Sequence, residues 1–451
     1  MGWLESIRMG TAQLRLPLRK AGVGLVAAAD VSPSAYLGGC SRLARFLGSD
    51  MAERGNFPLT GAEFATALAE APLPHCEAAR VAWQQVGDEI AANNIVGRRI
   101  QDLACVDNLA GFAAAHENLH RQLGHELADG RWRQLIASSH DVGDVVGATE
   151  VRRLRSQTAR GGTGFLRAIP ASFRAQINSV DFRVVMQRWL HQPLPLLMAE
   201  TLECHCWRHN AVGPATADRR GDHDMVCRNS SKIRRHNAVL RALAATARLA
   251  NIGTSFTSVL GLCRRPGETC KKQPDVVFDE FHDAASPSLL DGCVTDPTAL
   301  SHSNLLYESV GAAAAVKERA KSAKYRAMAE RMGFHFSAFG IESWGAWGPA
   351  ATRVLQRIVQ HAAEAGATNT MSTFGWCAPH IAEVGHQWVS VALRVEEARM
   401  IRQAVVRWRG GAVSQARAGV IFAGDEEGDD DVVAMGAGQL RQGAGGRRHQ
   451  L

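Results

Sequence analysis

The sequence lacks a run of about 18 apolar residues, so we expect no transmembrane helix and no membrane partner. It also lacks the cysteine density of a disulfide scaffold, because 10 cysteines are spread over 451 residues. A protein of this length folds without disulfides, which favours a reducing compartment, nuclear or cytoplasmic. With 46% hydrophobic and 21% charged residues, the composition is that of an ordinary globular protein.

The positive charge of the protein is concentrated in one segment. The whole sequence has a formal net charge of +7, but residues 201–273 alone contain 13 Lys and Arg against five acids. This local excess exceeds that of the whole sequence. It favours an anionic partner such as nucleic acid.

Apolar periodicity predicts a mostly helical first part, up to residue 199, and a mixed second part. In the second part the pattern predicts helices over 231–250, 309–332 and 381–408 and directly after Gly348-Pro349, and strands over 255–262, 275–278, 289–295 and 334–341. The predicted fold class is therefore α+β. The acidic and Gly/Arg-rich remainder, 413–451, is expected to be a disordered tail.

A possible metal site lies at the start of the second, mixed part of the sequence. Cys204, Cys206, His223 and Cys227 supply three thiolates and one imidazole, the donor set of a closed structural zinc site. His223 and Cys227 are four residues apart, so one helical turn can direct both side chains to the same side. Two alternatives stay open: His205 or His209 replaces a ligand, or these are free cysteines beside a surface histidine.

A second group of residues has the chemistry of phosphodiester hydrolysis. Asp275 begins one predicted strand and Asp291 lies inside the next, so paired strands would bring both carboxylates to one Mg²⁺. Lys321, Lys324 and Tyr325 follow on a predicted helix, and any of the three can face that site. The plainer interpretation is that the aspartates are turn residues and the lysines form a solvated helix face.

Short motifs follow one another in a single order from Cys204 to Pro349. They are Cys204-x-Cys206, Gly221-Asp222-His223 with Cys227, Ile233-Arg234-Arg235-His236-Asn237, Pro274-Asp275, Leu290-Asp291 with Val294-Thr295-Asp296-Pro297, Lys321 with Lys324-Tyr325, and Trp347-Gly348-Pro349. The ordered set resembles the zinc-knuckle and restriction-like endonuclease region at the C-terminal end of non-LTR retrotransposon proteins of algal and protist type. The resemblance implies the αβββαβ core of the PD-(D/E)xK nucleases.

The resemblance also implies an organisation for the whole protein. Leu16-Pro17-Leu18-Arg19 and the glycines that follow are similar, more weakly, to the stretch after the polymerase palm of such proteins. The polymerase motif Tyr-x-Asp-Asp is missing, so we expect no polymerase activity from this sequence. The implied domains are a helical region (1–199), a zinc knuckle (200–230), a nuclease core (231–366), a C-terminal helical segment (367–412) and the tail (413–451).

By position, the resemblance assigns roles to individual residues. Asp275 and Asp291 would hold Mg²⁺, and Lys321 or Lys324 would stabilise the transition state. Structural Zn²⁺ would sit on the four Cys and His ligands, and the partners would be DNA and also element RNA. The residues implied to contact nucleic acid are Lys232, Arg234, Arg235, His236, Lys271 and Lys272. For Arg234, Arg235 and His236, orientation of the core is the alternative role.

Two departures from the family pattern bear on activity. Related sequences carry a Glu near the position of Ser258, and they read Asp-Val-Thr-Val where this one has Gly292-Cys293. Glycine weakens a strand. A third-ligand role for Glu268 or Asp279 is an open alternative that no motif supports. Two alternatives to a DNA-nicking enzyme therefore stay open: an inactive, zinc-dependent nucleic-acid-binding remnant and a helical interaction protein.

Overall fold

The computed structural model describes a large part of the protein after residue 118 and little before it. The described residues are 12–14, 16–23, 119–140, 144–197, 203–204, 215–216, 218–227, 230–256, 274–279, 281, 286–302, 309–367 and 378–409, with four single positions between 81 and 88. The predicted tail at 413–451 lies outside them, as does most of the helical region predicted before residue 119.

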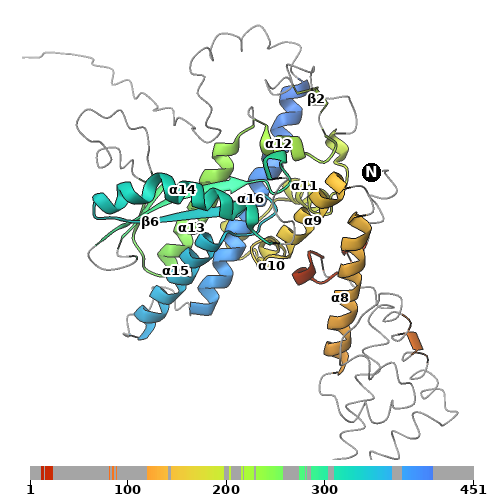
Figure 1. Ribbon diagram of the computed structural model, residues 1–451, viewed down its shortest axis with the longest axis horizontal. Helices are drawn as coiled ribbons and strands as arrows, with labels where there is room; N and C mark the ends of the chain where they lie inside the picture. The colour runs from red at the N-terminus through yellow and green to blue at the C-terminus, as the bar shows by residue number, and fades with distance from the viewer. Residues whose placement is uncertain are drawn as a thin grey trace, which may run out of the picture.

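The described residues form helices and short strands (Figure 1). The first part holds η1 (Leu18–Lys20), α8 (Leu119–His140), α9 (Asp144–Thr158), α10 (Gly164–Arg167), η3 (Phe173–Ala175), α11 (Ser179–Trp189) and η4 (Pro195–Leu197). Next come β1 (Glu203–Cys204), β2 (Ala215–Thr216), α12 (Asp222–Val226), α13 (Lys232–Leu249), β3 (Thr254–Ser255), β4 (Val276–Phe278) and β5 (Ser288–Thr295). The last are η7 (Leu300–His302), α14 (Ala312–Arg331), β6 (His335–Glu342), α15 (Pro349–Ala367) and α16 (Ala378–Arg409).

Four strands form a mixed sheet in the order β3-β4-β5-β6. β4 is antiparallel to β3 and to β5, whereas β5 and β6 run parallel over eight residue pairs, from Ser288↔His335 to Thr295↔Glu342. Because β5 is covered on both faces, seven of its eight residues are buried, and its sequence is apolar apart from a few polar positions. The strand that carries Asp291 is therefore a central, buried strand of the sheet.

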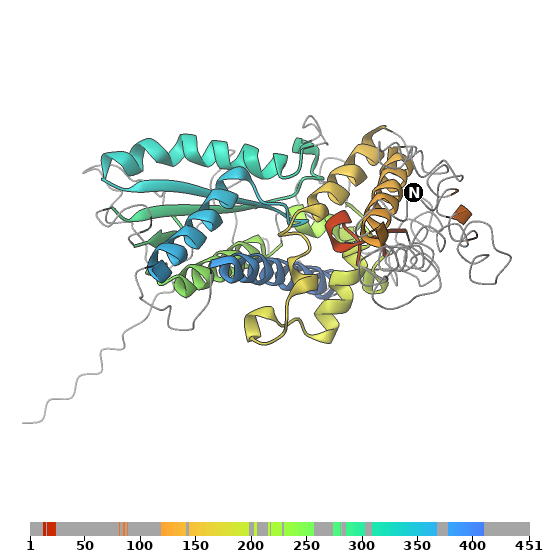
Figure 2. The same cartoon turned by 90° about the horizontal axis from the view of Figure 1, so that it is seen from below.

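Helices cover the two faces of this sheet (Figure 2). On one face, Val276, Leu290 and Phe339 pack in one core cluster with α13, α15 and α16. On the other face, Leu289 packs with Ala329 of α14. The side-chain alternation of a strand therefore sends Asp291, the neighbour of Leu290, toward the α14 face.

A second core cluster joins the earlier helices to α16. Phe165 of α10, Trp189 of α11 and Met225 of α12 pack against Ile401 and Val405 of α16. The same 32-residue helix carries Val389 and Leu393, which belong to the cluster under the sheet. α16 thus connects the first helices to the sheet.

The predicted elements of the second part are present within a few residues of their expected ends. The helix predicted over 231–250 is α13, the strand over 289–295 is β5, and the helix over 381–408 is α16. Of the strand predicted over 255–262, only its start lies among the described residues, within β3. No described helix has the length and hydropathy needed to cross a bilayer.

Candidate active site

Asp275 and Asp291 lie side by side on neighbouring strands. Asp275 directly precedes β4, and its backbone N–H donates to the Leu290 carbonyl at 2.9 Å. The antiparallel register pairs Val276 with Leu290, so it places Asp275 opposite Asp291. The two carboxyl groups lie close enough to shift each other's pKa. The pairing predicted from the two strands is therefore present.

Lys321 completes this acid pair from α14. Its Nζ donates to Asp291 Oδ2 at 2.7 Å, and the two side chains are 17% and 4% exposed. Lys324, the second lysine that we predicted for this role, is exposed, and its Nζ lies 5.5 Å from the Tyr325 ring centroid. Tyr325 is buried against Phe336. Positions i and i+3 lie about 60° apart on a helix, so the two lysines share one side of α14, but only the Lys321 ammonium reaches the acids.

His236 of α13 holds the other acid. Its Nε2 lies 3.2 Å from Asp275 Oδ2 and 3.1 Å from the Gly292 carbonyl oxygen, and its Nδ1 lies 3.1 Å from Asn237 Oδ1. From the sequence we expected for His236 either a DNA contact or a role in the core. The structure brings it to the acid pair, where its ring fixes the position of Asp275.

The electrostatics of the pair are asymmetric. Burial raises the pKa of Asp291 to about 7, and the adjacent Asp275 charge acts in the same direction against Lys321. Burial acts to raise the pKa of Asp275 too, but hydrogen bonding and charge from His236 outweigh it and lower that pKa. Two carboxylates in contact disfavour double ionisation, and a divalent cation would relieve this repulsion. The oxygen donor set suits a hard ion such as Mg²⁺.

Gly292 belongs to the construction of this site. An added Cβ at Gly292 would lie 2.7 Å from Leu240 Cδ2, because α13 crosses β5 closely at this point. The Gly292 N–H donates to Asp275 Oδ2 at 2.7 Å, and its carbonyl meets His236. We expected the glycine to weaken the strand. The structure leaves that expectation untested and adds a second role, because the Gly292 backbone contacts two side chains of the site.

A third acidic ligand is not among the described residues. Ser258 and Glu268 lie outside them, so the predictions for these two positions stay predictions. Asp279 follows β4 whereas Asp275 precedes it, and roughly 13 Å of extended strand separate the two positions. Asp279 is therefore too far along the strand to share a metal ion with Asp275 and Asp291. Within the described ranges, no group of three or more His, Cys, Asp or Glu is placed to hold a metal ion.

No family model matches this protein, and no curated protein matches it. The resemblance to retrotransposon proteins therefore stays a prediction.

The predicted zinc ligands are described only in part. His223 lies in α12 and Cys227 ends that helix, with its N–H donating to the His223 carbonyl at 2.7 Å, so the two share one helical turn as predicted. Cys227 is 5% exposed. Cys204 lies in β1, where only its backbone is described, and Cys206 lies outside the described residues. Convergence of the four ligands thus stays a prediction.

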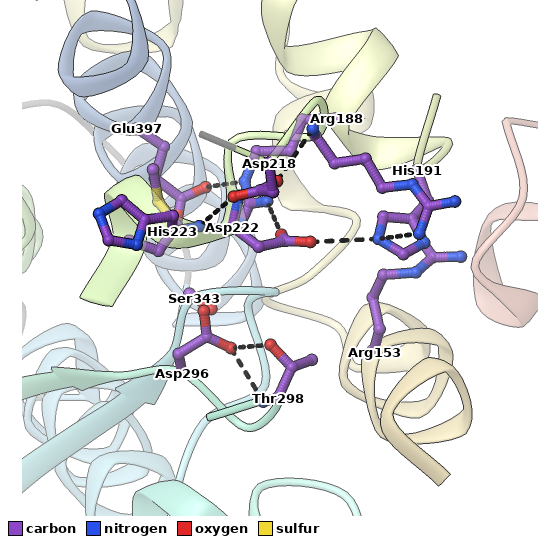
Figure 3. Close-up of polar contacts among 12 residues, drawn as sticks. Arg153, Arg188, His191, Asp218, Asp222, His223, Asp296, Thr298, Ser343 and Glu397 are labelled. Atoms are coloured by element: carbon purple, nitrogen blue, oxygen red, sulfur yellow. Dashed lines mark hydrogen bonds and ion pairs between the residues drawn. The ribbon is translucent and has the colours of Figure 1, made fainter. Parts of the chain in front are cut away.

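The turn before α12 is shaped by Asp218, whose carboxylate accepts the backbone N–H groups of Arg220, Asp222 and His223 (Figure 3). In the same view the His223 imidazole points away from the His191 ring, toward which the Asp222 carboxylate is directed. Asp222 itself pairs with Arg188 at 2.5 Å and with His191 Nε2 at 3.3 Å. His223 is therefore presented by a rigid turn, on the side opposite to an ion-pair cluster.

The residues predicted to contact nucleic acid differ in how far their side chains are buried. Arg234 is 52% exposed on its side chain and lies 3.6 Å from Glu396, and Lys232 is half-buried at the start of α13. Arg235 is 2% exposed and lies 3.6 Å from Glu397, so it cannot reach a phosphate. The DNA contact that we predicted for Arg235 is therefore wrong, because this side chain is buried. The alternative role, orientation of the core, agrees with its position beside Glu397. Lys271 and Lys272 lie outside the described residues.

A buried cluster of ion pairs was not predicted from the sequence. We call it the arginine hub: Arg153, Arg188, Arg235 and Arg394 with Glu150, Asp222 and Glu397. The Cζ atoms of Arg188, Arg153 and Arg394 lie 4.0, 5.5 and 5.9 Å from the Trp344 ring centroid. Two features of the sequence could have pointed to this cluster. Glu150/Arg153 and Arg394/Glu397 are opposite-charge pairs at i,i+3, and each lies on a helix that also carries an apolar stripe. The hub ties α9, α11, α13 and α16 together at one point.

Proposed function

We propose that this protein contains a divalent-metal-dependent DNA-nicking module of the PD-(D/E)xK type, related to the endonuclease region of non-LTR retrotransposon proteins. The observation that carries the proposal is the contact of Lys321 with Asp291, which in turn touches Asp275. The order α13, β3, β4, β5, α14, β6 supports it, because it is the helix and strand order that the motifs predict. Three residues from three separate elements meet where that order places them.

Each residue of the site would have its own role in phosphodiester hydrolysis. Asp275 and Asp291 would hold Mg²⁺, which when bound supplies Lewis-acid stabilisation of the phosphate and a more acidic water. The Lys321 ammonium, buried beside Asp291, is positioned to compensate charge on the scissile phosphate. His236 and the Gly292 N–H hold Asp275 in place. The basic segment before the site would retain the DNA backbone through its exposed Arg234.

A supercoiled-plasmid nicking assay with the full-length protein tests the proposal, with Mg²⁺ or Mn²⁺ added. The wild type should convert supercoiled plasmid to the open circle. Asp275→Ala and Asp291→Ala should abolish nicking, whereas Asp279→Asn, at the far end of β4, should not. Nicking that survives both alanine variants would remove the assignment.

The inactive nucleic-acid-binding remnant is the second candidate, favoured by one observation. Only two carboxylates converge among the described residues of the site. In this case the protein binds DNA with a steep salt dependence and leaves the plasmid intact. A filter-binding series from low to high salt, run beside the nicking assay, separates the two candidates.

We also propose a structural zinc ion on Cys204, Cys206, His223 and Cys227. The shared turn of His223 and Cys227 supports it, and thiolate with imidazole is the donor chemistry of zinc. Mass spectrometry of the intact native protein should find one zinc, and Cys227→Ser should lose it. A wild type that carries no zinc when purified without chelator contradicts the assignment.

A further inference from the structure

A groove of about 500 Å³ lies between α11, α13 and α16, away from the acid pair. Its apolar lining consists of Val180, Leu196, Val405 and Val406. Val180 and Val406 are 55% and 71% exposed, although valine is a side chain that folding normally removes from water. An apolar floor that the described residues leave uncovered is a surface on which a partner segment gains burial.

Three arginines line the same groove: Arg234 from α13 and Arg399 and Arg402 from α16. Their side chains are 52%, 43% and 46% exposed. Two acids neutralise part of this charge. Asp181 lies 2.6 Å from Arg402, and Glu396 lies 2.5 Å from Arg399 and 3.6 Å from Arg234. Three cations against two anions leave the groove positive.

His236 and Arg234 are two positions apart on α13, so they project from nearly opposite sides of that helix. The groove is thus separate from the acid pair, and the one residue that it shares with the proposed function is Arg234, the proposed DNA contact.

The lining selects for an occupant that is both acidic and aliphatic. A nucleic acid without base readout is held by aromatic side chains that stack on its bases and by a groove of basic residues. No aromatic residue lines the groove among the described residues, so it offers no stacking platform for bases. A segment with carboxylates beside small aliphatic side chains matches both the rim and the floor.

We propose that the groove binds a segment of this same protein, from Asp425 to Met435. That segment carries six acids between Asp425 and Asp431 and continues directly as Val432-Val433-Ala434-Met435. Its acids complement the arginine rim, and its four apolar residues complement the valine and leucine floor. The sequence has no other acid after Arg409, so this segment alone in that stretch can supply the carboxylates.

The tether has a suitable length. Arg409 is the last residue of α16, and 15 residues lie between it and Asp425. A random-coil chain of that length would span about 20 Å. The return path along α16 from Arg409 to Arg402 is roughly 10 Å. A covalent link of matching span raises the local concentration of the segment to about the millimolar range, so even a weak site is occupied.

Site-specific photocrosslinking of the full-length protein tests this docking. A benzophenone amino acid replaces Val406 in the groove or, as the matched control, Val310, an exposed valine that precedes α14. After irradiation and digestion, crosslinks from position 406 to residues 425–435 should exceed those from position 310 by about tenfold. Val432→Asp with Val433→Asp changes only the segment and should remove this excess of crosslinks. About 1 M salt should lower the excess in part, because it screens the charges.

Three results would overturn the proposal. The first is an equal crosslinking pattern from both positions. The second is crosslinking only between isotopically distinct copies, which makes a second molecule the occupant. The third is crosslinking of position 406 to an added oligothymidine with no crosslink to 425–435, which makes the groove a nucleic-acid surface. Arg399→Glu with Arg402→Glu changes the groove instead of the segment. This variant should also remove the excess of crosslinks from position 406, provided that its circular dichroism matches the wild type.

Discussion

Leu240 and Gly292 pack against each other so closely that a side chain at position 292 would have to displace the Leu240 side chain. A Cβ there would lie 2.7 Å from Leu240 Cδ2, and Leu240 is 2% exposed and held by the core. The contact sets how near α13 comes to β5. It therefore also sets how near His236 on that helix comes to Asp275.

A valine at position 292 should destabilise this protein. Gly292→Val forces α13 away from β5, and overpacking of this kind costs about 1–3 kcal/mol of unfolding free energy. Urea denaturation measures the loss. Leu240→Ala in the same protein opens space, so the double variant should lose less than the sum of the single variants. Strict additivity would show that the contact does not limit the approach of the helix.

The two lysines of α14 should differ sharply in activity. Lys321 touches Asp291, whereas Lys324 is exposed above Tyr325. Lys321→Ala should lower the plasmid-nicking rate by about 100-fold or more, because a preorganised charge at the scissile phosphate is removed. Lys324→Ala, the matched control, should stay close to the wild type. Equal losses would mean that the lysines act by general attraction of DNA.

The arginine hub should respond to single and paired substitutions in opposite ways. Arg153 and Glu150 are 2% and 4% exposed on their side chains, so Arg153→Met leaves a buried carboxylate with a reduced set of partners. Breaking such a pair from one side costs about 3–5 kcal/mol. Adding Glu150→Gln should recover a large part of this loss. Thermal unfolding of the wild type, the two single variants and the double variant measures the coupling energy between Arg153 and Glu150. A double variant as unstable as Arg153→Met alone would contradict the pairing.

Glu342 should make stability depend on pH. Burial raises the pKa of this carboxyl group to about 7 from an ordinary value of 4.5, although hydrogen bonds from Ser156 and Ala313 oppose the rise. Between these two pH values the folded protein binds the proton and the unfolded protein does not. The free energy of unfolding therefore falls as pH rises through this window, by up to about 3 kcal/mol.

Glu342→Gln removes that proton and should reduce the slope between about pH 5 and pH 8, leaving the part that Asp291 contributes, whose pKa is also raised to about 7. Urea midpoints across this range measure it. The exposed Glu364→Gln serves as the control and should keep the wild-type slope. An unchanged slope in Glu342→Gln would assign the pH dependence to other groups.

Much of the second part of the protein was predictable because its elements are regular. α13, β5 and α16 follow the apolar periodicity of their own sequences, so their ends agree with the expected ranges within about three residues. The meeting of Asp275 with Asp291 was also predictable, since it needs only that adjacent strands pair. Motif order then pointed to the helix that supplies the lysine.

Features that depend on helix rotation or on contacts between distant segments were not predictable. Arg234 and Arg235 are neighbours with the same charge, yet one is exposed and the other is buried beside Glu397. Lys321 and Lys324 differ in the same way. The reason for glycine at position 292 lies in Leu240, 52 residues earlier in the sequence. Composition and spacing carry no signal for such contacts.

Asp275 and Asp291 should together hold one divalent metal ion. A titration of the full-length protein with Mn²⁺, followed by electron paramagnetic resonance of the free ion, measures this binding. The wild type should bind one ion, which is lost in Asp275→Asn with Asp291→Asn and retained in Asp279→Asn. Equal Mn²⁺ binding by the wild type and the double variant would contradict it.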